Sequence, residues 1–251
     1  MSLTQLTTRA QLGIDAFEVR VEVHISNGLP AFTVVGLPET AVREARDRVR
    51  SAVLNSGFEF PARRITVNLA PADLPKTGGR FDLPIALAIL AASGQVKEEG
   101  LAGFACFGEL ALSGACCRID DLLPSLVACQ QAGQAVIIPQ QNKPEASLLR
   151  DLPIRLADSL AEICSSLNGG DALPTPMPAH SIQPNFQGLD LVDVYGQQQA
   201  RRALEIAAAG GHHMLMMGPP GTGKSMLAQR LISILPQMSE AEAIECASLR
   251  S

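Results

Sequence analysis

The stretch Gly218-Pro219-Pro220-Gly221-Thr222-Gly223-Lys224-Ser225 decides how the C-terminal part of this 251-residue chain folds. It fits the phosphate-binding loop pattern, in which a glycine and four residues precede Gly-Lys-Ser/Thr. Glycines allow the backbone angles and the close approach by which several amides converge on phosphate oxygens. Lys224 is expected to reach the β- and γ-phosphates, and the Ser225 hydroxyl to contact Mg²⁺. The stretch therefore predicts a site for ATP with Mg²⁺.

The segments on either side support this prediction. Residues 214–217, Met-Leu-Met-Met, are a short apolar run suited to a buried strand. Residues 226–235 repeat apolar side chains at helical spacing. A loop between a strand and the amino end of a helix, where anions are favoured, is the setting that phosphate binding requires. The Gly-x-Gly-x-x-Gly fingerprint of dinucleotide binding does not occur in the sequence.

A change of composition separates this part from the rest of the chain. Residues 169–189 contain several prolines and have no charged residue between Asp171 and Asp190. Such a segment predicts an extended, semi-rigid linker. We therefore expect a first domain over residues 1–168 and a second over residues 190–251.

The first domain alternates predicted strands with predicted helices, which indicates an α/β or α+β class. Apolar and polar residues alternate over 17–25, the pattern of a half-buried strand. The other predicted strands are 31–35, 65–69, 104–112 and 135–138. The predicted helices are 38–56, 82–93, 122–132 and 158–167.

Composition excludes several classes of protein. Apolar residues make up 47% and charged residues 18%, as in a folded globular protein rather than a disordered one. The N-terminus lacks the pattern of a signal peptide, and the uncharged stretch 122–142 would make a poor membrane span. The six cysteines form no Cys-x-x-Cys pair and are typical of reduced thiols. These features predict a cytoplasmic protein without a membrane partner.

The charge distribution leaves two interpretations open. The formal net charge is 20 − 25 = −5, so nucleic-acid binding would need a local basic patch. Residues 41–80 carry eight Lys and Arg against four Asp and Glu. The arginines of the predicted helix 38–56 alternate with acids, as on a solvated face with local ion pairs. The other interpretation is a contact with nucleic acid or with another subunit.

Five longer blocks carry a family resemblance. They are Gly-Leu-Pro-Glu-Thr (36–40), Glu-Ala-Arg-Asp-Arg-Val-Arg-Ser-Ala (44–52), Asn-Leu-Ala-Pro-Ala-Asp-Leu-Pro-Lys (68–76), Gly-Gly-Arg-Phe-Asp-Leu-Pro-Ile-Ala (78–86) and Ala-Ala-Ala-Gly-Gly-His (207–212). Together they resemble the YifB/ComM family of Mg-chelatase-like AAA+ proteins, from about residue 3 to the end. In AAA+ proteins a Gly-Gln element lies beside the adenine. By this resemblance Val194 and Tyr195, which precede Gly196-Gln197, would flank the nucleotide base.

The resemblance also implies partners and an activity. It implies an ATPase motor that acts on DNA by branch migration or as a helicase in natural transformation, and that assembles as a homo-hexamer. It further implies that the first domain is similar to the peptidase domain of Lon. Lon-type peptidases use a serine activated by a lysine. By eye, Arg80 stands where that serine would be and Leu123 stands near the lysine position, so we expect no peptidase activity.

Four cations remain as candidate DNA contacts. Arg80 stands where Lon-type peptidases carry the catalytic serine, and this replacement suggests a binding or assembly role. We hypothesise that it contacts DNA together with Arg63, Arg64 and Lys76.

The sequence departs from the family pattern after Ser225. A phosphate-loop motor needs an acidic Walker B pair, a sensor and an arginine finger, and none is recognised in the 26 residues that follow. We therefore expect a truncated chain that binds ATP without hydrolysing it efficiently. The alternative is a non-catalytic DNA-binding or assembly module with a vestigial ATPase segment. A magnesium chelatase subunit is disfavoured, because such subunits carry the phosphate loop near the N-terminus.

Overall fold

The structure, a computed structural model, describes residues 2–35, 40–76, 78–176 and 188–249. The chain divides into two compact units. Unit 1 comprises residues 1–179 with 246–251, and unit 2 comprises residues 180–245. Strands and helices are mixed in the chain, so the predicted α/β class is confirmed.

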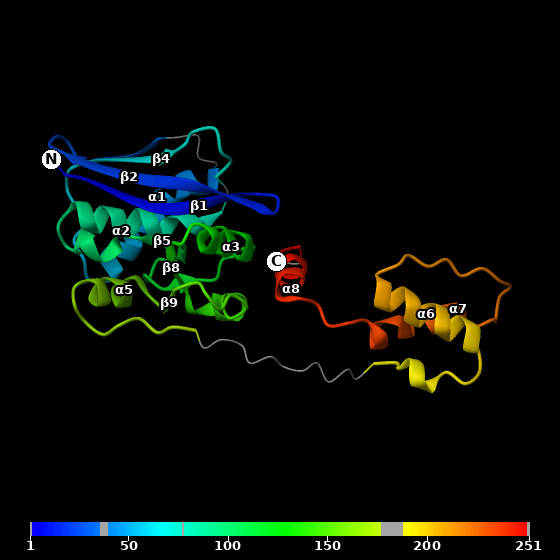
Figure 1. Cartoon of the computed structure of the whole chain (residues 1–251). Coiled ribbons are helices and arrows are strands. Elements are labelled where there is room, and N and C mark those ends of the chain that lie inside the picture. The colour runs from blue at the N-terminus through cyan, green and yellow to red at the C-terminus, as the bar shows by residue number, and fades with distance from the viewer. Residues whose placement is uncertain (1, 36–39, 77, 177–187, 250–251) are drawn as a thin grey trace. The chain divides into compact units, whose positions relative to one another are not determined.

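Unit 1 is built on a seven-stranded sheet with the spatial order β3-β4-β2-β1-β5-β8-β9 (Figure 1). Its strands are β1 (Ser2–Leu12), β2 (Asp15–Ser26), β3 (Ala31–Val35), β4 (Arg64–Ala70), β5 (Phe104–Cys106), β8 (Ala135–Pro139) and β9 (Ile154–Ala157). β2 pairs antiparallel with β1 and β4, and the other neighbours pair in parallel. The alternation predicted for β2 is confirmed, since Val19, Val21 and Val23 are fully buried.

β1 is a strand that the sequence pattern does not predict, although it lies inside the sheet between β2 and β5. Five of its 11 residues are Thr or Gln, and the four apolar residues do not alternate regularly with polar ones. Even so, Thr4, Thr8 and Arg9 are buried. The Arg9 guanidinium is satisfied internally, because it donates to the Gln134 side chain at 2.8 Å and to the Cys129 sulfur at 3.2 Å. Pairing with two neighbouring strands therefore overrides the weak apolar pattern.

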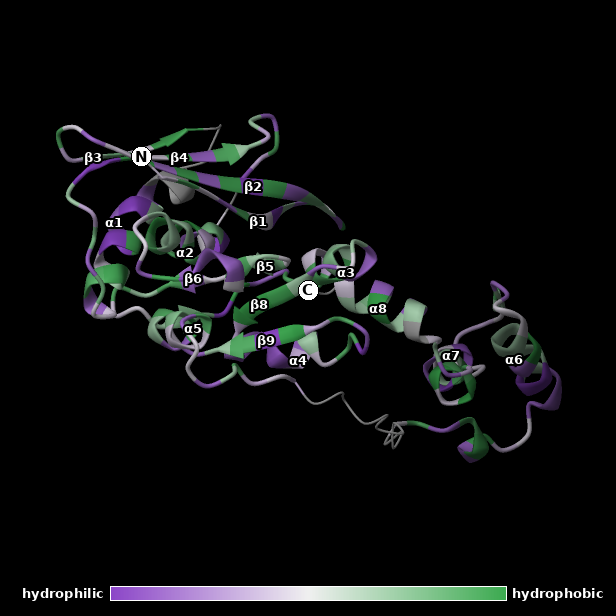
Figure 2. Cartoon of the chain, turned by 60° about the vertical axis from the view of Figure 1, so that its left-hand side comes forward, coloured by the Kyte–Doolittle hydropathy of each residue, from purple (hydrophilic) through white to green (hydrophobic). Residues whose placement is uncertain are grey.

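Helices cover the sheet of unit 1. They are α1 (Thr40–Asn55), α2 (Asp82–Ala92), α3 (Leu123–Gln131), α4 (Lys143–Ala146) and α5 (Leu160–Leu167), with short 3-10 turns at Gly79–Phe81, Glu98–Leu101 and Gln140–Asn142. Every residue of α2 is buried, and α2 contacts β1, β2, α1 and α5. Figure 2 shows its apolar residues in green beneath β1 and β2. This helix is the centre of the core.

The predicted strand 104–112 is divided in two. β5 ends at Cys106, and β6 (Glu109–Leu110) pairs with β7 (Cys116–Cys117) in a separate two-stranded sheet. Between them, the Gly108 amide donates to the Arg80 carbonyl, and the Gly108 carbonyl accepts from the Leu83 amide. These bonds to the start of α2 divert the chain from the sheet.

The start of the predicted linker belongs to unit 1. Leu173 is buried, and the Leu156 amide of β9 donates to the Pro174 carbonyl at 2.8 Å. Residues 177–187 of the linker lie outside the described residues. The predicted domain bounds therefore stay a prediction, with residues 173–174 held on β9.

Unit 2 is small and helical. Its elements are a 3-10 turn at Leu191–Asp193, α6 (Gln198–Gly210), α7 (Lys224–Arg230), a 3-10 turn at Leu231–Ile234 and α8 (Glu240–Ser248), whose last residues group with unit 1. The predicted strand 214–217 is wrong: these residues pair with no strand among those described, and Leu215 and Met217 are exposed. A strand needs a neighbour to satisfy its backbone groups, and the described part of unit 2 supplies none. The predicted helix 226–235 is α7 followed by the 3-10 turn.

Two further expectations can be compared with the structure. No helix in the described ranges is long and apolar enough to cross a membrane. All six cysteines are free thiols, and Cys106, Cys116, Cys129 and Cys164 are buried.

Candidate functional site

The phosphate-loop stretch forms an exposed loop that leads directly into α7. Its backbone depends on glycine at two places, because Gly221 and Gly223 both have φ of +83°. L side chains rarely adopt that conformation. The glycines are therefore required for the curve of the loop.

The Lys224 side chain forms hydrogen bonds with oxygens of the same loop. Its ammonium donates to the carbonyl oxygens of Gly218 and Pro219, both at 2.8 Å, and to the Thr222 hydroxyl at 3.3 Å. The Thr222 hydroxyl in turn donates to the Pro219 carbonyl at 2.9 Å. The Lys224 cation thus lies at the centre of a ring of oxygens. Phosphate oxygens are stronger partners for an ammonium than neutral carbonyls are.

The Gly-Gln element contacts this loop. Gln197 lies just before α6 in a left-handed conformation, and its side-chain amide donates to the Thr222 carbonyl at 3.0 Å. Val194 is buried in the small core of unit 2, and its carbonyl accepts from Arg201 at 3.0 Å. Tyr195 is 94% exposed. Of the two predicted base-flanking residues, Tyr195 is open to a ligand, whereas the Val194 side chain supports the core.

The side chains around the loop fit a magnesium ion that arrives with its nucleotide. Ser225 is exposed in the first turn of α7, directly after Lys224. Within the described ranges, no group of three or more His, Cys, Asp and Glu side chains could hold a metal ion alone. Mg²⁺ is commonly held by one or two protein oxygens together with phosphates and water. A single hydroxyl at this position suits that mode.

The four predicted DNA contacts do not lie on one surface. Arg63 and Arg64 are exposed where β4 begins, whereas Lys76 and Arg80 are buried. The Lys76 ammonium donates to the Pro71 and Leu74 carbonyls, and its burial lowers the pKa of the amine. The Arg80 cation and the Lys76 cation are thus engaged inside unit 1, which favours structural roles for both.

Arg80 occupies the place that the Lon resemblance gives to the serine. Its guanidinium donates to the Ser125 hydroxyl at 3.5 Å, to the Gln11 side chain at 3.4 Å and to the Asp120 carbonyl at 3.3 Å. Ser125 lies on α3, two residues after the buried Leu123. The fold therefore brings the two dyad positions near each other, and Arg80 joins α3 to β1. Burial lowers the pKa of the guanidinium.

A buried ion pair close to Arg80 in the sequence was not predicted. Arg48 of α1 donates to both carboxylate oxygens of Asp82, at 2.9 and 3.2 Å. Asp82 is fully buried and also accepts from the Leu110 amide. Burial raises the pKa of the carboxyl to about 6, although Arg48 opposes the rise. The available signal was one carboxylate at the start of a helix that is otherwise wholly apolar.

Comparison with known proteins places this chain among its relatives. A family described as "Subunit ChlI of Mg-chelatase" matches residues 21–142, and one described as "Magnesium chelatase, subunit ChlI" matches residues 190–251. The chain is 52% identical over 251 residues to protein YifB of Salmonella typhimurium, covering 100% of this chain and 49% of that protein. It is 51% identical to YifB of Escherichia coli, with the same coverage. It is 52% identical over 256 residues to competence protein ComM of Haemophilus influenzae, covering 50% of it. The chain thus spans about half the length of these relatives.

Proposed function

Because this chain belongs to the ChlI-like family that includes YifB and ComM, we propose that its unit 2 binds ATP with Mg²⁺ through residues 218–225. One observation carries the proposal. The Lys224 ammonium lies in a ring of loop oxygens, on a backbone that only glycines permit at Gly221 and Gly223. In the proposed complex, phosphate oxygens replace the carbonyls as partners of Lys224.

The other residues have distinct proposed roles. Backbone amides of the loop donate to phosphate oxygens, and the Ser225 hydroxyl contributes a ligand to Mg²⁺. When bound, Mg²⁺ offsets the negative charge of the phosphates. Tyr195 offers an exposed ring to the base, and Gln197 fixes the loop through its hydrogen bond to the Thr222 carbonyl.

The proposal also covers the activity of the whole protein. We extend the family resemblance to an ATP-driven motor that acts on DNA as a homo-hexamer in the cytoplasm. Similarity to a competence protein and the exposed Arg63 and Arg64 support a role with DNA. Free thiols are suited to a reducing compartment. The competing function is a DNA-binding or assembly module in which the ATPase segment does no work.

A titration with a fluorescent ATP analogue and Mg²⁺ tests nucleotide binding. The chain is expected to bind saturably, and Lys224→Ala to weaken binding at least about tenfold, because a charge-assisted hydrogen bond is lost. Lys143→Ala removes the same charge from an exposed position on α4 of unit 1 and is the matched control. Equal binding by the chain and Lys224→Ala would reject the proposed site.

A further inference from the structure

One pocket of unit 1 has a lining that is both apolar and charged. It has a volume of about 450 Å³ and is formed by the start of β3, the middle of α1 and the segment that leads into β4. Its apolar lining includes Phe32, Phe60 and Pro61. Its charged lining consists of Arg46, Arg50, Arg63 and Asp47, which gives a formal charge of 3 − 1 = +2.

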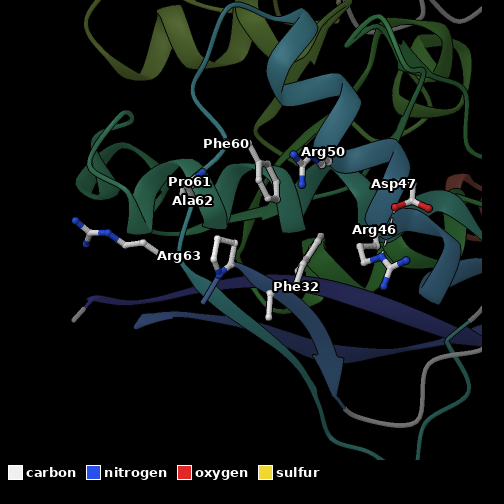
Figure 3. A pocket seen from close by; sticks show the side chains of 10 residues that line it. Phe32, Arg46, Asp47, Arg50, Phe60, Pro61, Ala62 and Arg63 are labelled. Atoms are coloured by element: carbon white, nitrogen blue, oxygen red, sulfur yellow. Dashed lines mark hydrogen bonds and ion pairs between the residues drawn. The ribbon is translucent and has the colours of Figure 1, made fainter. Parts of the chain in front are cut away.

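The aromatic and cationic side chains of the pocket contact one another, and we call the Arg50 guanidinium over the Phe60 ring the Arg50–Phe60 layer. The Phe32 and Phe60 rings lie 5.7 Å apart between centroids, with an angle of 55° between their planes. The Arg50 guanidinium lies over the Phe60 ring, 5.4 Å from its centroid. Figure 3 shows Arg50 beside Phe60, with Arg46 and Arg63 at opposite ends of the pocket. A guanidinium within cation–π distance of a ring is itself planar and cationic, and a further planar group can lie on it.

The two end arginines are available to an anionic ligand. Arg46 pairs with Asp47 at 3.4 Å, but both side chains are more than half exposed. An exposed ion pair of this kind adds little stability, so a phosphate can replace the carboxylate at low cost. Arg63 is exposed at the other end.

We infer that this pocket is a site for single-stranded nucleic acid, in which a base stacks on the Arg50–Phe60 layer and flanking phosphates contact Arg46 and Arg63. Aromatic and guanidinium faces with cations on either side are the general means of binding unpaired strands. Bases within a duplex do not offer their faces to a pocket, so the aromatic lining favours an unpaired strand. The inference rests on the DNA role proposed above and adds its location and the state of the strand.

Anisotropy of fluorescein-labelled oligothymidine with the full chain tests this site. Arg50→Ala is expected to weaken binding at least about fivefold, because base stacking is removed. Arg50→Lys keeps the charge but not the planar guanidinium, so the affinity of this variant for oligothymidine should lie between that of the wild type and that of Arg50→Ala. The Arg46→Ala, Arg63→Ala double variant should lower the slope of log affinity against log salt by about 1.4, which is about 0.7 for each phosphate that the protein no longer neutralises. If Arg46 and Arg63 had only structural roles, the slope of log affinity against log salt would not change in the double variant.

Matched controls separate the possible outcomes. Arg20→Ala on β2 removes the same charge from an exposed position of unit 1 and should bind as the wild type does. Oligothymidine binding that is equal in the pocket variants and in Arg20→Ala would overturn the site while leaving the DNA role standing. Equal affinity for a duplex of the same length would overturn the single-strand assignment. No binding of either DNA by the wild type would contradict the DNA role itself, and the ATP titration judges the phosphate loop separately.

Discussion

The side-chain amide of Gln197 donates a 3.0 Å hydrogen bond to the carbonyl oxygen of Thr222, and so joins the segment before α6 to the phosphate loop. The two residues are 25 positions apart. Thr222 is also the residue whose hydroxyl accepts from Lys224. Through this hydrogen bond, the Gly-Gln element orients the loop oxygens around the cation as well as lying next to the proposed base site.

Gln197→Ala should weaken binding of the fluorescent ATP analogue by about two- to tenfold, because one neutral hydrogen bond that orders the loop is removed. The same titration on Gln199→Ala provides the comparison, since Gln199 is an exposed residue of α6. If both variants bind like the wild type, Gln197 has no part in ordering the loop.

Arg48→Ala should lower the free energy of unfolding by about 3 kcal/mol at neutral pH, because the fully buried Asp82 carboxylate loses its cation. Urea unfolding measures this value. Arg46→Ala, on the exposed face of the same helix, should change it by less than about 0.5 kcal/mol. A similar small change in both variants would mean that the ion pair contributes no stability.

Asp82 should also make stability depend on pH in a defined direction. Its pKa rises from 3.8 to about 6 on folding, so between these values the folded chain retains a proton that the unfolded chain releases. Its contribution to the free energy of unfolding is therefore fully present below about pH 4 and is lost as the pH rises through about 6. In urea unfolding across this range, the wild type should show a decline that is smaller in Asp82→Asn. Parallel curves for the two proteins would contradict the raised pKa.

Arg80→Ala should lower the melting temperature without changing affinity for DNA. The variant loses charge-assisted hydrogen bonds to Ser125, Gln11 and the Asp120 carbonyl, which corresponds to about 1.5–3 kcal/mol. Thermal unfolding and oligothymidine anisotropy on the same sample measure both effects. A loss of DNA affinity at unchanged melting temperature would restore Arg80 as a DNA contact.

Strands with strong alternation and helices with clear periodicity could be predicted from sequence. β2, β4, α1 and α5 follow their apolar patterns closely, whereas α2 is a continuous apolar run. β1 could not be predicted, because Thr and Gln carry no apolar signal and its burial depends on two neighbouring strands. Residues 214–217 show the opposite failure: the apolar run is present, but the described residues offer it no strand partner.

The candidate nucleotide site was predictable because its chemistry lies in one short segment with fixed spacing. Gly221 and Gly223 have positive φ and Lys224 donates to loop oxygens, while nucleotide binding by these residues stays a prediction. The roles of the unit 1 cations Lys76 and Arg80 could not be predicted, because the burial of these side chains depends on how the chain folds around them. Lys76 is enclosed by a local loop, while Arg80 reaches α3 and β1. The Arg50–Phe60 layer likewise joins a helix to a loop and leaves no motif in the sequence.

Hydrogen–deuterium exchange of residues 218–225, with and without ATP and Mg²⁺, tests the central claim most directly. Backbone amides that donate to phosphate oxygens should exchange more slowly when nucleotide is bound. We predict slower exchange at Gly221, Thr222, Gly223, Lys224 and Ser225 in the wild type, and less slowing in Lys224→Ala at a nucleotide concentration that only just saturates the wild type. Exchange in the wild-type loop that is the same with saturating nucleotide as without it would contradict the assignment of this loop as the ATP site.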